Sequence, residues 1–69
     1  MNFNYSKLLG RMRECGFTQE QLAKAIGISK YTLNAKLNNK FKFNSEEMLA
    51  IAKVLNIPLD EFGEYFFAA

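Results

Sequence analysis

Few residues in this sequence are suited to catalysis. The chain has no histidine and a single cysteine, Cys15. A Ser–His pair, a Cys–His pair and a zinc site made of Cys and His within one chain are therefore excluded. No glycine-rich phosphate-binding loop is present, and Glu46 and Glu47 suit a helix dipole better than an acid–base pair. We expect a binding protein rather than an enzyme, with no cofactor, no metal and no small-molecule ligand.

The chemistry that the sequence does offer is electrostatic. The net charge of +2 is unevenly distributed, because residues 1–42 hold eight basic and two acidic residues whereas residues 43–69 hold one basic and five acidic residues. A basic half indicates a polyanionic partner, since each Lys or Arg that neutralises a phosphate releases counterions. Ordinary solvated helix faces would give the same composition, so charge alone leaves both interpretations open.

Helices must position these side chains. The chain has 69 residues, 49% of them apolar, which suits one small domain over residues 1–69. No apolar run approaches the roughly 18 residues that span a bilayer, and the first residues lack the features of a signal peptide, so we expect a cytoplasmic protein. Apolar residues at helical spacing predict an all-α fold with five helices, at about residues 5–15, 18–26, 29–38, 45–56 and 58–67.

Polar residues and glycines mark the expected helix ends. The Thr18 hydroxyl and the Gln21 side chain can form a reciprocal capping box at the start of the second helix. Gly27 can take the left-handed conformation that ends this helix and starts a sharp turn. The other predicted end signals are Asn4, Ser29, and Asn44 or Ser45 as N-caps, and Gly16 and Asn56 as terminators.

The second and third helices form the most informative pair. They are joined through Gly27, Ile28 and Ser29, and they can cross steeply because the small residue Ala23 lies where they meet. Ile28 and Leu33 then pack the third helix against the second. This arrangement predicts a helix-turn-helix.

The string TQEQLAKAIGISKYTL, residues 18–33, resembles the core motif of phage Cro/CI-like repressors, the XRE-type helix-turn-helix family. The five-helix plan extends this resemblance across about residues 4–67. The string LNAKLNNK, residues 33–40, together with the aromatic ending Tyr65-Phe66-Phe67, is similar to small regulators of temperate phages of Gram-positive bacteria. The resemblance implies a lambda-repressor-like fold and a sequence-specific regulator of transcription, whose helix 29–38 enters the major groove of an operator in double-stranded DNA.

Two departures from the family pattern concern the third helix. Where many relatives pair a buried Arg with a Glu, this chain has Met12 and Leu37, and an apolar contact can replace such an ion pair without loss of stability. Lys36 stands where the family has an apolar residue, and Leu37 takes over the apolar role.

The predicted DNA contacts follow from helix geometry and from the resemblance. With Leu33 and Leu37 buried, a step of about 100° per residue turns Tyr31, Ala35 and Asn38 outward. Lys30 would bind guanine acceptors, Asn34 an adenine or a phosphate, and Ala35 a thymine methyl group. The predicted base-reading residues are Lys30, Tyr31, Thr32, Asn34 and Ala35, and the predicted phosphate contacts are Thr18, Gln19, Asn38, Asn39, Lys40 and Lys42.

Some of these side chains have simpler explanations. Thr18 can cap a helix and also face a phosphate, and Lys40 and Lys42 can serve solubility alone. Residues 38–44 read as a loop pinned by Phe41 and Phe43, with a short strand as the alternative because Lys and Phe alternate. Cys15 reads as a small hydrophobic residue.

Partner binding can follow two routes. As a DNA-binding regulator the chain would act as a homodimer on its operator, with a two-fold contact through Tyr65, Phe66 and Phe67, although these rings could instead cover helix ends. The alternative is a protein-interaction module, like an antirepressor or an antitoxin, that uses the aromatic C-terminus and the acidic half to hold a protein partner.

Overall fold

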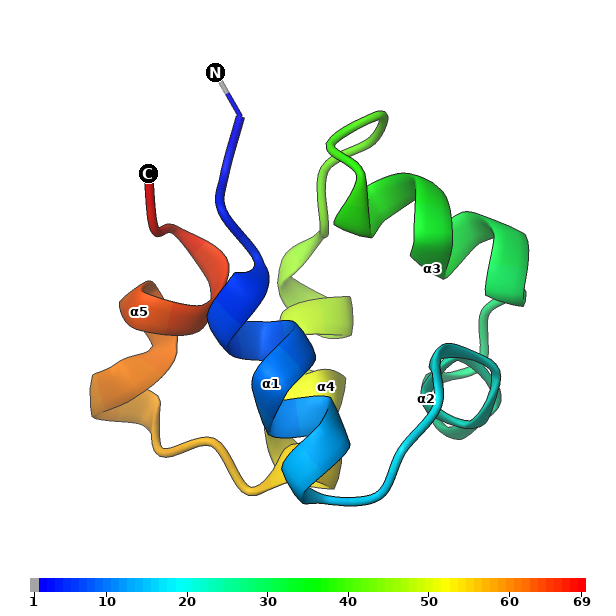
Figure 1. Cartoon of the computed structure of the whole chain (residues 1–69), viewed down its shortest axis with the longest axis horizontal. Coiled ribbons are helices and arrows are strands. Elements are labelled where there is room, and N and C mark those ends of the chain that lie inside the picture. The colour runs from blue at the N-terminus through cyan, green and yellow to red at the C-terminus, as the bar shows by residue number, and fades with distance from the viewer. Residues whose placement is uncertain (1) are drawn as a thin grey trace.

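The structure, a computed structural model, describes residues 2–69. Its helices are α1 (Ser6–Glu14), α2 (Gln19–Ile26), α3 (Lys30–Leu37), α4 (Ser45–Leu55), the 3₁₀ helix η1 (Leu59–Glu61) and α5 (Phe62–Phe66) (Figure 1). Residues 2–69 contain no strand, so the all-α prediction is confirmed and Phe41 and Phe43 lie in a loop. In the same part of the chain, no helix is long and apolar enough to cross a membrane.

The predicted caps of the central helices are confirmed. Thr18 and Gln21 form the reciprocal capping box of α2, and Gly27 ends that helix with a φ of 82°. The Ser29 side chain accepts a hydrogen bond from the N–H of Thr32 at the start of α3. Asn44 also caps α4, Asn56 ends it in the left-handed conformation, and Gly16 has a φ of 76° after α1. The prediction for Asn4 is wrong: the N-cap of α1 is Tyr5, which makes no side-chain cap bond, and Asn4 accepts from the N–H of Ser6 just before it.

The predicted fifth helix is present over residues 59–66, but its first turn is a 3₁₀ helix. Pro58 keeps an extended backbone with ψ 145°, and the chain then makes the 3₁₀ turn η1 before the single short helix α5. Ile57 is 6% exposed, and its N–H bonds to the Ala52 carbonyl as α4 ends. Asn56 thus ends α4, Ile57 anchors the connection in the core, and only Phe62–Phe66 are α-helical after η1.

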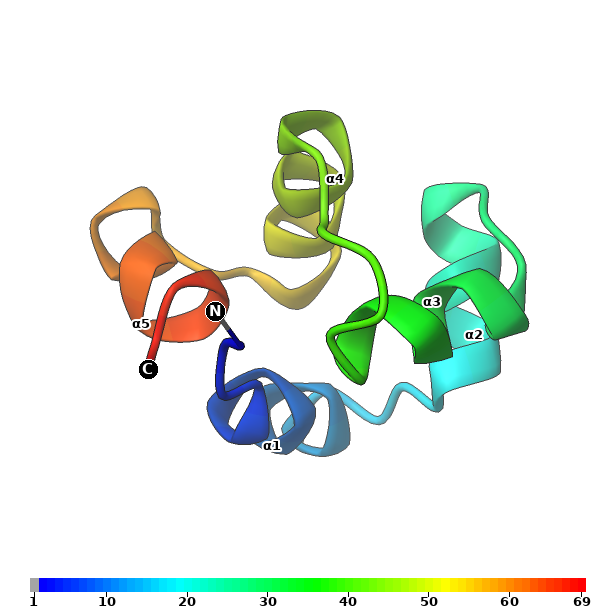
Figure 2. The same cartoon turned by 90° about the horizontal axis from the view of Figure 1, so that it is seen from above.

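One core joins all five α-helices. The largest fully buried side chains are Leu8, Leu22, Leu33, Ile51, Leu55 and Phe66, which come from each helix in turn. Met12 and Leu37 both belong to this core, in line with the apolar replacement expected for the buried ion pair. The core gathers these helices around α4, which Figure 2 shows between the α5 end and the α2–α3 end of the molecule.

The two chain termini lie side by side. The N–H of Asn4 donates to the carbonyl of Ala68 at 2.8 Å, and Phe3 packs edge-on against Phe67 with ring centroids 5.7 Å apart. Tyr5 continues the aromatic cluster, because its ring meets Phe43 edge-on at 5.5 Å. The N-terminal segment therefore closes the aromatic end of the core.

Three basic side chains of residues 1–42 serve the fold. Arg11 donates to the carbonyls of Leu55 and Asn56, which are unsatisfied at the end of α4. Lys7 forms an ion pair with Glu64 on α5, and Lys36 forms one with Glu47 on α4. The positive charge that remains for a partner is smaller than the sequence suggests.

Candidate functional site

The turn between α2 and α3 sets the orientation of the candidate site. Ala23 is 1% exposed and Leu33 is fully buried, so the two helices meet through a small residue. The N–H of Ile28 donates to the Ala23 carbonyl at 3.0 Å, which ties the turn to α2. In Figure 1, α2 is seen end-on while α3 runs across the view. The steep crossing of a helix-turn-helix is therefore present, as predicted.

α3 exposes a narrow strip of side chains, which we call the α3 strip: Lys30, Tyr31, Asn34 and Asn38. Tyr31 is the most exposed large apolar residue of the strip, at 76%. Lys30 forms no ion pair within residues 2–69. Thr32 lies at the edge, half-buried, with its hydroxyl bonded to Ser29 at 2.8 Å. The strip thus presents one charge, one aromatic ring and two amides.

The prediction for Ala35 is wrong. Its side chain is 3% exposed and cannot reach a thymine methyl group. The chain after α3 turns back, and the N–H of Lys40 donates to the Ala35 carbonyl at 2.9 Å. α3 is therefore covered along a wider arc than the positions of Leu33 and Leu37 alone indicate.

A chain of amides links the two helices across this face. The Asn34 side chain donates to Gln19 on α2 at 3.1 Å, and Asn38 donates to the backbone carbonyl of Asn34 at 2.8 Å. Asn38 also donates to the Asn34 side-chain oxygen at 3.2 Å, so the Asn34 amide is held in one orientation before any ligand binds. Thr18 lies exposed beside Gln19 at the N-terminal end of α2.

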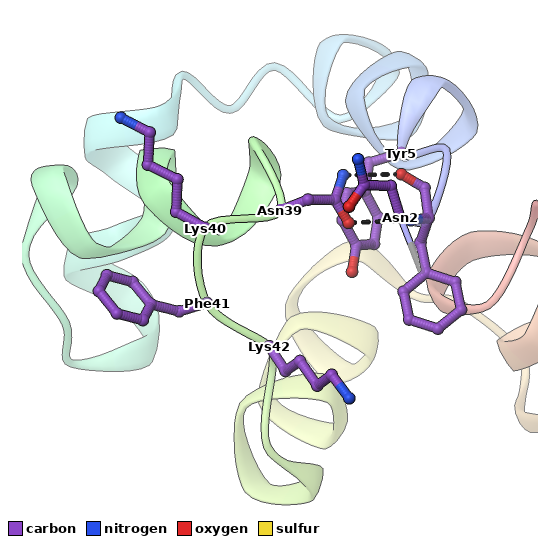
Figure 3. A pocket seen from close by; sticks show the side chains of 7 residues that line it. Asn2, Tyr5, Asn39, Lys40, Phe41 and Lys42 are labelled. Atoms are coloured by element: carbon purple, nitrogen blue, oxygen red, sulfur yellow. Dashed lines mark hydrogen bonds between the residues drawn. The ribbon is translucent and has the colours of Figure 1, made fainter.

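Asn39 does not fit its predicted phosphate role. Its side-chain oxygen accepts from the N–H of Phe3 at 2.8 Å, and its side-chain nitrogen donates to the Phe3 carbonyl at 2.9 Å. Figure 3 shows both bonds. The amide is fully engaged in holding the N-terminal segment, so Asn39 would have to release Phe3 before it could bind a phosphate.

The aromatic residues are distributed differently from the prediction. Phe43 pins its loop at 6% exposed, whereas Phe41 is 59% exposed. Tyr65 and Phe66 are 7% and 1% exposed, so a two-fold contact through them is wrong, and Phe67 is the exposed member of that trio. Among the described residues, two of the five exposed large apolar side chains, Tyr31 and Phe41, lie on α3 and the loop that follows it. The other three are Leu49, Leu59 and Phe67.

Comparison with known proteins now assigns the chain to a family. Residues 1–69 match DUF739, described as "Protein of unknown function". The chain belongs to the DUF739 family. It is also similar to the solution structure of the modulator of repression (MOR) of the temperate bacteriophage TP901-1 from Lactococcus lactis, with 37% identity, a TM-score of 0.81, and coverage of 97% of this chain and 90% of that one. No curated protein matches it.

For this DUF739 chain, the comparison supports a phage regulatory protein with an all-α fold. It agrees with the narrower likeness to phage regulators found at residues 33–40 and 65–67. The expectation of a Cro/CI-like repressor goes further than either finding. The family description names no activity, and the similar structure is described as a modulator of repression.

Sequence reasoning missed the ion pairs of the DUF739 chain, of which the pair between Lys36 and Glu47 is the most buried. The side chains of Lys36 and Glu47 are each 12% exposed and face one another between α3 and α4. Burial raises the pKa of the Glu47 carboxyl. Hydrogen bonds from Lys36 and from the Asn44 N–H, together with the charge of Lys36, lower it by more than burial raises it, so the pKa lies below its ordinary value. Lys36 in an otherwise apolar position was the available signal.

Proposed function

We propose that this chain modulates repression by binding another protein through the α3 strip and Phe41. The observation that carries the proposal is its likeness to a phage modulator of repression, at 37% identity over 97% of the chain. A partner consistent with that description is a transcriptional repressor whose action the complex changes.

The chemistry of the α3 strip supports a protein partner. Tyr31 and Phe41 are 76% and 59% exposed, and aromatic side chains of this size are enriched in the buried centres of protein interfaces. Lys30 and Lys40 lie exposed next to these rings in the chain and form no ion pair within residues 2–69. This surface suits a partner with an apolar centre and acidic surroundings.

Direct DNA binding through the same face is the second candidate. The hydrogen bond between Gln19 and Asn34 favours it, because a fixed amide on α3 can read a base edge while the N-terminus of α2 meets a phosphate. On this alternative the base-reading residues are Lys30, Tyr31, Thr32 and Asn34, and the phosphate contacts are Thr18, Gln19, Asn38, Lys40 and Lys42.

Paired binding measurements distinguish protein binding from DNA binding. Calorimetry with a repressor from the same genome should give a complex that Tyr31→Ala weakens by about tenfold or more. Leu59→Ala is the matched control, because Leu59 is 75% exposed and lies beside α5, far from α3 (Figure 1). In gel shifts with genomic fragments at low salt, the chain alone should shift no fragment selectively. A selective shift that Tyr31→Ala abolishes, without a protein complex, would establish DNA binding instead.

A further inference from the structure

A recess lies between the N-terminal segment and the loop after α3. It has a volume of about 240 Å³, and no residue of the α3 strip lines it. Asn39 frames it, because the two hydrogen bonds to Phe3 fix the distance between the segment and the loop. The lining residues are Asn2, Phe3, Tyr5, Asn39, Lys40, Phe41 and Lys42 (Figure 3).

Tyr5 contributes an unused hydroxyl to this recess. Its side chain is only 6% exposed, and its ring packs edge-on against Phe43. Tyr5 lines the recess (Figure 3). Its hydroxyl takes part in no hydrogen bond within residues 2–69, and because no fully buried side-chain oxygen of these residues lacks a partner, the hydroxyl is open to solvent and free to bind a ligand. Burial raises the pKa of the Tyr5 phenol, so this group is a neutral donor at physiological pH.

Lys42 supplies the positive charge. Its side chain extends on the same side of the loop as Tyr5 and Asn2, whereas Lys40 and Phe41 extend to the opposite side (Figure 3). Lys42 is exposed and forms no ion pair within the described residues. One ammonium group, one hydroxyl and the Asn2 amide therefore line the same recess, and each can donate to an oxyanion.

We propose that this recess binds a carboxylate group, supplied by an acidic side chain of the partner protein, with the Tyr5 hydroxyl and the Lys42 ammonium as donors. The source of the carboxylate rests on the proposed function, whereas carboxylate binding itself does not. One positive charge and two neutral donors suit a carboxylate monoanion.

An NMR titration of the whole chain with N-acetylglutamate amide tests the proposal. The amide signals of Phe3, Asn39 and Lys42 should shift and saturate, and the neutral N-acetylglutamine amide should leave them in place. Tyr5→Phe removes only the hydroxyl and should weaken binding about tenfold. Lys42→Gln, at an exposed site where folding is not at risk, should weaken it about threefold.

Matched controls separate this site from general charge effects. Tyr31→Phe removes an exposed hydroxyl, and Lys24→Gln removes an exposed lysine on α2; both should bind the glutamate probe like the unmodified chain. Equal binding of the glutamine probe, or an unchanged affinity in Tyr5→Phe, would overturn the proposal. So would a DNA duplex that shifts the same signals and loses affinity in the same two variants. If the unmodified chain binds the glutamate probe but forms no complex with the repressor, the result would instead count against the proposed function alone.

Discussion

The two ends of this molecule use aromatic residues in opposite ways. At the end where the termini meet, Phe43 packs edge-on against both Tyr5 and Phe66, and all three rings are almost fully buried. At the α2–α3 end, Tyr31 and Phe41 stand exposed. The sequence predicts the exposed Tyr31 and the buried Phe43, but it makes Phe41 an anchor and leaves the C-terminal aromatics as either a two-fold contact or a cover for helix ends. An aromatic residue therefore becomes core or surface according to what the rest of the chain brings against it.

The largest effect should come from the buried aromatic end. Phe66 is 1% exposed, and Phe66→Ala leaves a cavity that costs about 3–5 kcal/mol. A domain this small has a total stability of about that size, so the variant should be largely unfolded at 25 °C by circular dichroism. A cooperative transition close to that of the unmodified chain would show that the aromatic cluster is not what holds the two termini together.

A smaller effect should follow from the Asn39 clamp. Asn39→Ala removes two hydrogen bonds to Phe3 and places alanine at a φ of 63°, which should lower the free energy of unfolding by about 2 kcal/mol in urea titrations. Asn39→Gly keeps the backbone conformation available and loses only the bonds, so it should cost less. If alanine and glycine are equally destabilising, backbone strain plays no part at this position.

The Lys36–Glu47 pair should give a still smaller, pH-dependent effect. The folded pKa of Glu47 lies below its ordinary value of 4.5. The stabilisation is therefore complete above that value and is lost as the pH falls through the lower, folded pKa. Glu47→Gln should cost about 1 kcal/mol at pH 7, with the difference shrinking below pH 4 in urea unfolding. Glu46→Gln, at an exposed site, is the control, and an equal pH dependence in both variants would contradict the assignment.

The smallest effect on stability should come from the exposed end. Tyr31→Ala should change the free energy of unfolding by less than about 0.5 kcal/mol, because Tyr31 is 76% exposed. The same variant should lose partner binding, which separates a binding role from a structural one. A loss of stability of the size seen for Asn39→Ala would mean that Tyr31 supports the fold, and the contrast between the two ends would fail.

Features that depend on neighbours in the sequence were predictable. Thr18 and Gln21, three residues apart, form their capping box as expected, and Gly27 takes its left-handed conformation. Helical spacing gave the all-α fold, and the turn through Gly27, Ile28 and Ser29 gave the helix-turn-helix. Backbone conformation and caps depend on residues within three or four positions of one another, so the residues that decide them can be recognised in the sequence.

Features that depend on distant partners were decided by the tertiary structure. Asn39 bonds to Phe3 across 36 residues, Lys36 meets Glu47 across 11 residues and a loop, and Ala35 is covered when the chain after α3 turns back. The same holds for the recess at Tyr5, which exists because a segment from one end of the chain lies against a loop from its middle. Periodicity records which side of a helix is apolar, but burial and pairing depend on which other segment arrives at that side.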